Sequence, residues 1–375
     1  MTSTVKQYLS DYTFAAACLL VVLAMSAATL FGQKPASDEL QIQKCWEHKF
    51  DSGGDGRITA AGGAVYVVRA GSVIEAVAAD SGKLLWTSDS GGAIDSNLIV
   101  EGDSVYFIRR TIPAAGTATE AALRAVSTST GITRRSVAIG AGEGFSLGKN
   151  DSGLIAVSKS GEVLSFALAD GTLRSRRQLA TPIELPPIFE ANTTLVVSDK
   201  KQIASFNGTG DPSVIAKSEY NISTVEPNTV ERIYFGDERG NLTSFSTDSG
   251  SVYWQFKSGG GISDIIKFDG KVIAASNDNF VYALATFNGN RLWKRRVAGR
   301  VAALRGVGTE TLLVQPLGDD NVILLAAKNG KVVGQIPVSS GEFVTGSAVP
   351  ELSRIVILTD SGLYSYGIGG CPVIK

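Results

Sequence analysis

The residues best able to do chemistry in this sequence are few. The chain of 375 residues holds three cysteines, Cys18, Cys45 and Cys371, and one histidine, His48. No two cysteines form a C-x-x-C pair, so the sequence does not predict a zinc ribbon or a thioredoxin-type site. A Ser-His-Asp triad would have to use His48, and a histidine-rich metal site cannot be built. We therefore predict that the protein is not an enzyme and that His48 is structural or solvent-facing.

Acidic turns are the next candidates, because calcium prefers carboxylate and carbonyl oxygens. Such turns occur at Asp51–Asp55, Asn277–Asn279 and Asp319–Asn321. None matches an EF-hand loop, and Asp, Asn and Gly are also the ordinary residues of hairpin turns. The glycine-rich segments Gly142–Gly144 and Gly259–Gly261 lack the lysine of a phosphate-binding loop. We interpret these segments as turns and expect neither a metal nor a cofactor.

The composition indicates a protein with many short strands that does not bind nucleic acid. Hydrophobic residues make up 44%, there are 42 glycines, and the net charge is −1, so no global basic field attracts nucleic acid. Basic residues gather on segments that we expect to be outer strands, where charge protects an unpaired edge; contact with anionic lipid or an acidic partner is the alternative. They are Arg134, Arg135, Arg174, Arg176, Arg177, Arg291, Lys294, Arg295 and Arg296.

Internal repetition gives the architecture that must position these residues. The segments Val65–Trp86, Ile233–Trp254 and Val272–Trp293 each read as an apolar strand, a polar turn, a second strand, a Gly turn and a third strand. When weaker copies of the repeat are included, the starts of successive copies are separated by 40, 49, 41, 38, 39, 40 and 43 residues. This period is typical of a four-stranded propeller blade. The sequence predicts an all-β, eight-bladed β-propeller of antiparallel blades.

Tryptophans mark the boundaries between the predicted blades. Trp86, Trp254 and Trp293 each lie four residues after a turn glycine, where they would anchor one blade against the next. The last copy ends without such a strand, but Lys44–Phe50 at the other end of the fold carries Trp46. We expect this N-terminal strand to complete the eighth blade and close the ring.

Closure in this way predicts a disulfide. Cys45 opens the closing strand, and Cys371 lies just beyond its proposed neighbour, Leu363–Ile368. Antiparallel pairing places the start of the first strand beside the end of the second. The two cysteines should therefore meet and form a bond, which an extracytoplasmic compartment permits. Two unrelated cysteines near the chain ends are the alternative.

The N-terminal region predicts membrane attachment. Phe14–Phe31 holds 18 uncharged residues, just enough to span a bilayer. We favour a signal anchor, with a cytoplasmic segment at 1–13, a tether at 32–43 and the propeller at 44–375. The anchor would make a single-pass inner-membrane protein whose propeller is extracytoplasmic. A signal peptide cleaved after Ser26–Ala28, releasing the protein to the periplasm, is the alternative. Lipidation at Cys18 is the weakest reading, because Ala15–Ala17 makes a poor lipobox.

The repeat V-Y-V…G-x-x-x-W resembles that of the quinoprotein-like, or PQQ-repeat, propeller family. The layout from Lys44 onward, with its N-terminal Trp strand and short final blade, is similar to the BamB type within it, an outer-membrane protein assembly lipoprotein. BamB-type proteins imply a non-catalytic scaffold. Quinoprotein dehydrogenases imply a redox enzyme with pyrroloquinoline quinone and calcium. The absence of adjacent cysteines, and four tryptophans already assigned to blade anchors, favour the scaffold.

These observations lead to a ranked set of functions. The first is a membrane-tethered interaction scaffold facing the periplasm, in outer-membrane β-barrel assembly, whose propeller is a monomer within a complex of other proteins. The second is a quinone-dependent dehydrogenase, and the third is the ligand-binding ectodomain of a membrane sensor. The longest break in the repeat, Thr111–Ala121, is the candidate partner loop. The residues that we select in it are Thr111, Ile112, Pro113, Thr117 and Glu120.

Overall fold

The computed structural model describes residues 39–371 apart from 52, 112–118, 152, 209, 230, 318–320 and 352. The chain divides into two units, Met1–Leu40 and Gln41–Lys375, and the folded unit described below is the second. Within the described residues there is no helix long and apolar enough to cross a membrane. Phe14–Phe31, Cys18 and the tether up to residue 38 lie outside the described residues.

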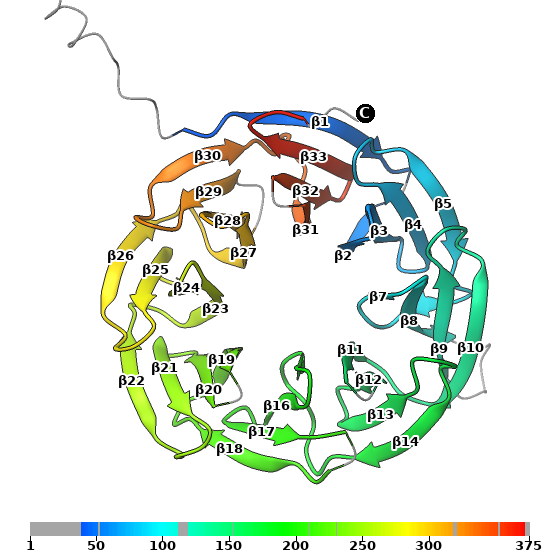
Figure 1. Cartoon of the computed structure of the whole chain (residues 1–375), viewed down its shortest axis with the longest axis horizontal. Helices are drawn as coiled ribbons and strands as arrows, with labels where there is room; N and C mark the ends of the chain where they lie inside the picture. Colours follow the sequence, from blue (N-terminus) through cyan, green and yellow to red (C-terminus); the bar gives the residue numbers. More distant parts are fainter. Residues whose placement is uncertain are drawn as a thin grey trace, which may run out of the picture. The chain divides into compact units, whose positions relative to one another are not determined.

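The folded unit is a ring of eight small antiparallel sheets, as Figure 1 shows for the described residues. We number these sheets as blades from the one that follows the first strand. The strands of blades 1 to 4 are, in blade 1, β2 (Gly54–Ala61), β3 (Ala64–Arg69), β4 (Val73–Ala78) and β5 (Leu84–Asp89); in blade 2, β6 (Ala93–Ile94), β7 (Ile99–Glu101), β8 (Ser104–Thr111), β9 (Glu120–Ser127) and β10 (Thr133–Gly140); in blade 3, β11 (Ser146–Asn150), β12 (Gly153–Val157), β13 (Glu162–Phe166) and β14 (Leu173–Gln178); and in blade 4, β15 (Ile188–Phe189), β16 (Thr194–Ser198), β17 (Gln202–Phe206) and β18 (Ser213–Lys217).

The second half of the ring repeats the same order from the axis to the rim. Its strands are, in blade 5, β19 (Ile222–Thr229), β20 (Arg232–Asp237), β21 (Asn241–Ser246) and β22 (Val252–Lys257); in blade 6, β23 (Ile262–Phe268), β24 (Lys271–Ser276), β25 (Phe280–Ala285) and β26 (Arg291–Arg296); in blade 7, β27 (Val301–Val307), β28 (Thr311–Pro316), β29 (Val322–Ala326) and β30 (Val332–Ile336); and in blade 8, β31 (Val344–Glu351), β32 (Arg354–Thr359), β33 (Gly362–Ile368) and, outermost, β1 (Ile42–Lys49). The predicted eight-bladed, four-stranded architecture is confirmed.

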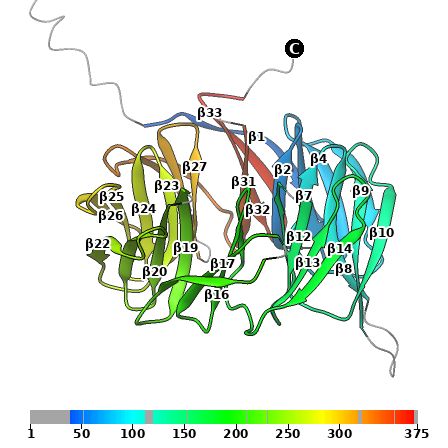
Figure 2. The same cartoon turned by 60° about the horizontal axis from the view of Figure 1, so that its bottom comes forward.

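The N-terminal strand closes the ring, as expected. β1 pairs antiparallel with β33, from Ile42 opposite Ile368 to Lys49 opposite Gly362. The pairing begins two residues earlier than the sequence indicated, and Phe50 lies just beyond it, donating its N–H to the carbonyl of Ser361 at 2.9 Å. Figure 2 shows that the start of β1 and the end of β33 lie on the same side of the ring.

Blade 2 departs from the simple repeat at its innermost strand, which is broken into β6 and β7. The hydroxyl oxygen of Ser96 accepts the N–H of Ile108 at 2.9 Å, and the N–H of Asp95 donates to the carbonyl of Ile108 at 2.8 Å. A side chain has therefore taken the place of a backbone partner, and the strand is interrupted there.

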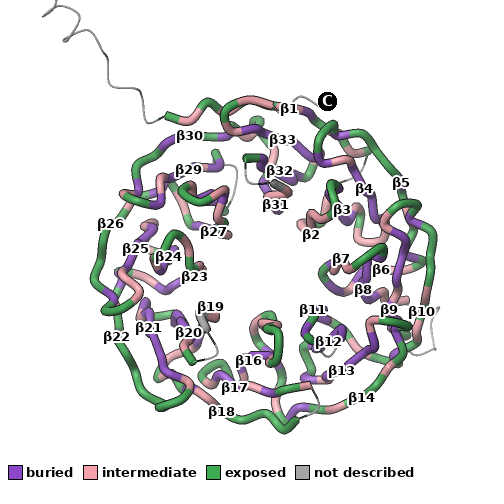
Figure 3. Tube along the Cα trace, in the orientation of Figure 1, coloured by how far each residue is buried: buried purple, intermediate pink, exposed green. Residues whose placement is uncertain are grey.

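The burial of each strand follows its distance from the axis. Middle strands such as β3 and β24 are buried on nearly every residue, because a neighbouring blade covers each of their faces. Outer strands such as β14 alternate between partly buried and exposed residues. Figure 3 shows this gradation around the ring. The apolar core is accordingly divided among the boundaries between blades; one cluster joins Val65 and Val67 of blade 1 to Val356 and Leu358 of blade 8.

Candidate functional site

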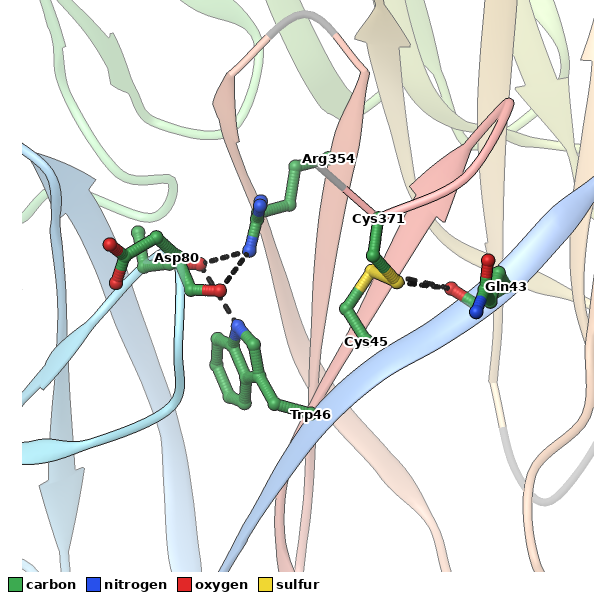
Figure 4. The surroundings of a disulfide bond; sticks show 7 residues. Gln43, Cys45, Trp46, Asp80, Arg354 and Cys371 are labelled. Carbon is green, nitrogen blue, oxygen red and sulfur yellow. Dashed lines mark hydrogen bonds between the residues drawn. A yellow bond between two sulfur atoms is a disulfide. The ribbon is translucent and has the colours of Figure 1, made fainter. Parts of the chain in front are cut away.

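The ring closure carries a disulfide between Cys45 and Cys371, whose Cα atoms are 5.4 Å apart (Figure 4). Cys45 is the extra residue of a β-bulge, because the register steps from Lys44 opposite Tyr366 to Trp46 opposite Ser365. The bond joins residues 326 positions apart in sequence. The predicted disulfide is confirmed, and it fastens the two ends of the folded unit to each other.

Two buried side chains reinforce the closure by reaching from blade 8 to blade 1. The indole N–H of Trp46 donates to the carbonyl of Ala79 at 3.0 Å. The guanidinium of Arg354, only 1% exposed, donates from Nη1 to the carbonyls of Ala79 at 2.6 Å and Asp80 at 2.9 Å. Figure 4 shows both donors converging on this turn. Arg354 was not found by sequence reasoning, because an arginine at the start of an apolar strand gives no sign of its distant partner.

His48 also takes part in the contact between the closing strand and blade 1. Its Nε2 lies 3.0 Å from the Glu75 carboxylate, which is 4% exposed. The other oxygen of Glu75 lies 3.2 Å from Nε of Arg69. The histidine therefore sits against a buried carboxylate at a blade boundary.

The other three tryptophans lie at separate blade boundaries and share one geometry. The indole N–H groups of Trp86, Trp254 and Trp293 donate to the carbonyls of Thr128, Thr286 and Ala327 at 2.7, 2.9 and 2.8 Å. Each acceptor belongs to the turn of the following blade, so each tryptophan joins two blades. The structure does not bring the four tryptophans together, and no shared aromatic floor forms among the described residues.

Polar side chains on the innermost strands form a second set of bridges that sequence reasoning missed. Glu226 on β19 accepts the N–H of Lys267 on β23 at 3.2 Å. Asp264 on β23 accepts the N–H of Leu304 on β27 at 2.7 Å. Arg305 on β27 donates from Nε to the hydroxyl of Ser347 on β31 at 3.0 Å. These contacts link blades 5, 6, 7 and 8 in series around the axis.

The surroundings of these bridging side chains shift the pKa values of Glu226, Asp264 and Arg305. Burial raises the pKa of the Glu226 carboxyl to about 7, and the nearby Asp264 and Glu190 carboxylates act in the same direction. Burial also raises the pKa of Asp264, against the bonds that it accepts from the N–H groups of Leu304 and Ile265. The pKa of Arg305 is lowered by burial. The Glu226 carboxyl thus titrates near neutral pH.

The candidate partner loop is described only at its two ends. Thr111 ends β8 and Glu120 begins β9, and the Thr111 hydroxyl donates to the Glu120 carbonyl at 3.2 Å. Ile112, Pro113 and Thr117 lie outside the described residues. Glu120 is exposed.

The acidic turns serve as turns where they are described. The Asp278 carboxylate accepts the N–H of Gly259 at 2.9 Å and the hydroxyl of Tyr282 at 2.5 Å. Burial, followed by this hydrogen bond, raises the pKa of Tyr282 to about 12. Asp55 pairs with Arg57. In the part of the chain that the structure describes, no group of three or more His, Cys, Asp or Glu residues is arranged to hold a metal ion.

A ring of eight four-stranded blades, with an indole on the turn of the following blade at four described boundaries and an N-terminal closing strand, defines the chain as a PQQ-repeat β-propeller. The family model described as outer membrane protein assembly factor BamB matches residues 36–141 and 223–356, and the chain belongs to that family. No curated protein sequence matches the chain. The fold and the family support a general role as a protein-interaction scaffold.

Solved structures share the fold at low sequence identity. BamB from Moraxella catarrhalis aligns with a TM-score of 0.63 and 15% identity over 89% of this chain and 100% of that one. The C-terminal WD40 domain of Sif2 gives 0.71 and 13% over 88% and 99%. The computationally designed Ika8 protein gives 0.72 and 13% over 87% and 99%. At such identities these likenesses concern the fold alone.

Proposed function

We propose that this chain is a non-catalytic scaffold that faces the periplasm, is held at the membrane by its N-terminal segment, and takes part in the assembly of outer-membrane β-barrel proteins. The observation that carries the proposal is the match of the BamB family model to both halves of the propeller. A propeller fixed at its closure by a disulfide offers rigid blade edges and loops, which suit a protein that holds partners.

The state of the reactive side chains supports a binding role. His48 is engaged with the buried Glu75, and Cys45 and Cys371 are bonded to each other. Asp278 is occupied by Gly259 and Tyr282. The described groups that sequence analysis singled out for chemistry thus serve the fold.

The disulfide and the N-terminal sequence support the location. Disulfides persist in oxidising compartments such as the bacterial periplasm. Phe14–Phe31 is long enough to span a bilayer. A propeller held outside the cytoplasm by this segment would lie in a compartment where the bond between Cys45 and Cys371 persists.

Site-specific photocrosslinking in cells, followed by mass spectrometry, tests the proposal. A photoreactive amino acid replaces Glu120 at the base of the candidate partner loop, and a matched probe replaces Asp248 on an exposed turn of blade 5. We expect the Glu120 probe to capture subunits of the barrel-assembly machinery and the Asp248 probe to capture fewer. Capture of a redox enzyme in their place, or equal capture from both positions, would contradict the proposal.

A further inference from the structure

The boundary between blades 2 and 3 is built differently from the tryptophan boundaries. A methyl group added to Gly131 would lie 2.5 Å from the ring of Trp86, which shows how closely that ring covers the turn. At the equivalent turn of blade 3, a methyl group on Gly171 would lie 2.7 Å from Cδ of Arg135. An arginine therefore occupies the place that an indole takes at the other boundary.

A cavity of about 500 Å³ opens at this boundary. Its walls are the turn between β7 and β8, the side chains of Tyr106 and Ala125, the pair Arg134 and Arg135, and the turn residues Leu168 and Ala169. Tyr106 is 8% exposed and lies deep in the wall. Pockets for small organic ligands have volumes of this order, and this one combines apolar residues with charged ones in its walls.

Most charges around the cavity already have partners. The Glu101 carboxylate lies 2.7 Å from Nζ of Lys149, and the Asp103 carboxylate lies 2.5 Å from Nη1 of Arg134. Asp170 is close enough to feel the charge of Arg135, but it accepts hydrogen bonds from the N–H and hydroxyl of Thr172 at 3.0 and 2.7 Å.

Arg135 is the exception among these groups. Residue Arg135 is half-buried, and within the described part of the chain its guanidinium makes no hydrogen bond or ion pair, although its charge acts on the Asp170 carboxyl. At the tryptophan boundaries the indole donates to the carbonyl three residues before the turn glycine, as Trp86 does to Thr128. The corresponding residue of blade 3 is Leu168, whose carbonyl receives no indole.

We propose that this crevice binds a small organic monocarboxylate with an apolar body. The planar guanidinium of Arg135 presents paired N–H donors that match a carboxylate. The apolar body would lie against Tyr106, Ala125 and Leu168. The carboxylates of Glu101 and Asp103 in the cavity wall, and that of Asp170, which interacts with the charge of Arg135, disfavour a dianion such as phosphate more strongly than a monoanion. This inference is independent of the scaffold role.

Calorimetric titration of the full chain tests the site, with phenylacetate as the probe and the uncharged phenylacetamide as its matched control. We expect phenylacetate to bind with a Kd on the order of 1 mM or tighter, because a ligand of this size makes few contacts. Phenylacetamide and inorganic phosphate should bind at least about 10-fold more weakly, since the first lacks the charge and the second carries more of it.

Three variants separate the site from general effects on the fold. Arg135→Gln should weaken phenylacetate binding by about 10-fold or more. Arg135→Trp should abolish binding while keeping or raising Tm, because it installs the residue that the tryptophan boundaries use. Arg291→Gln, an exposed arginine on the outer strand of blade 6, should leave Kd unchanged.

Four outcomes would overturn the proposal. They are no heat of binding with phenylacetate, equal binding of the amide, tighter binding of phosphate, and unchanged affinity in a folded Arg135→Trp protein.

Discussion

Trp46 on β1 and Arg354 on β32 donate hydrogen bonds to the same carbonyl oxygen, that of Ala79 (Figure 4). An internal boundary has the same arrangement, since Trp254 and Arg232 both donate to the carbonyl of Thr286, at 2.9 and 3.1 Å. The closure therefore has the same pair of hydrogen bonds as an internal blade boundary. At the closure, however, the two donors come from opposite ends of the propeller.

Removal of the buried arginine at the closure should destabilise the protein. Arg354→Leu leaves the carbonyls of Ala79 and Asp80 without these donors, and we expect a loss of about 2–4 kcal/mol in the free energy of unfolding. Urea denaturation measures the loss. Arg232→Leu is the matched control at an internal boundary; it should lose about 1 kcal/mol, because Arg232 is less buried and makes one such bond. Equal losses would contradict the special importance of the closure.

The disulfide should contribute strongly to stability. Cys45→Ser or Cys371→Ser should lower the free energy of unfolding by roughly 2–5 kcal/mol, because the bond restricts a very long loop in the unfolded chain. Thermal denaturation with and without reductant measures the effect. Cys18→Ser should leave Tm unchanged. Alkylation of both Cys45 and Cys371 in the unreduced protein would show that the bond is absent in solution.

Alanine substitutions at two turn glycines distinguish the effect of backbone strain from that of a clash with a tryptophan ring. Gly289 and Gly250 have φ of 70° and 66°, so alanine is strained at both. A methyl group would lie 2.5 Å from the Trp254 ring at Gly289, but would meet no atom within 4 Å at Gly250. Gly289→Ala should therefore lose about 1–3 kcal/mol more than Gly250→Ala in urea denaturation. Equal losses would show that the Trp254 ring moves aside without lowering the free energy of unfolding.

Glu226 should make stability depend on pH. Its pKa is about 7 in the fold against 4.5 for the free group, so the folded state holds the proton more tightly. The contribution of Glu226 to the free energy of unfolding is complete below pH 4.5 and is lost as pH rises through about 7.

Replacement of Glu226 by Gln should remove this dependence. Between pH 5 and pH 8 the wild type should lose on the order of 2 kcal/mol relative to Glu226→Gln. Urea midpoints at several pH values measure the difference, and Glu184→Gln, at an exposed carboxylate, is the control. A constant difference across this range would contradict the prediction.

The N-terminal segment should keep the full chain in the membrane. Because Phe14–Phe31 is uncharged over 18 residues, carbonate extraction should leave the protein in the membrane pellet. A variant with Leu20→Arg and Val22→Arg should move to the supernatant. A soluble wild-type protein that begins at Thr29 would show a cleaved signal peptide instead.

The sequence by itself determined the number of blades, the closing strand and the disulfide. Each blade is a local unit whose strands and Gly turns follow one another in the chain, so the repeat is visible as a period. The pairing of the N-terminal strand with Leu363–Ile368 followed from the strand that the last copy lacked, and with it the meeting of Cys45 and Cys371.

Only the tertiary structure decided what lies between the blades. The contact of Arg354 with Ala79, the neighbours of Glu226 that raise its pKa, and the meeting of Arg135 with Leu168 in one cavity wall all join residues about one blade apart or more. Nothing in the repeat specifies these pairs, because the period fixes where strands begin and not which side chains of adjacent blades meet. Packing across the boundaries selects those partners, and it does so differently where an arginine replaces a tryptophan.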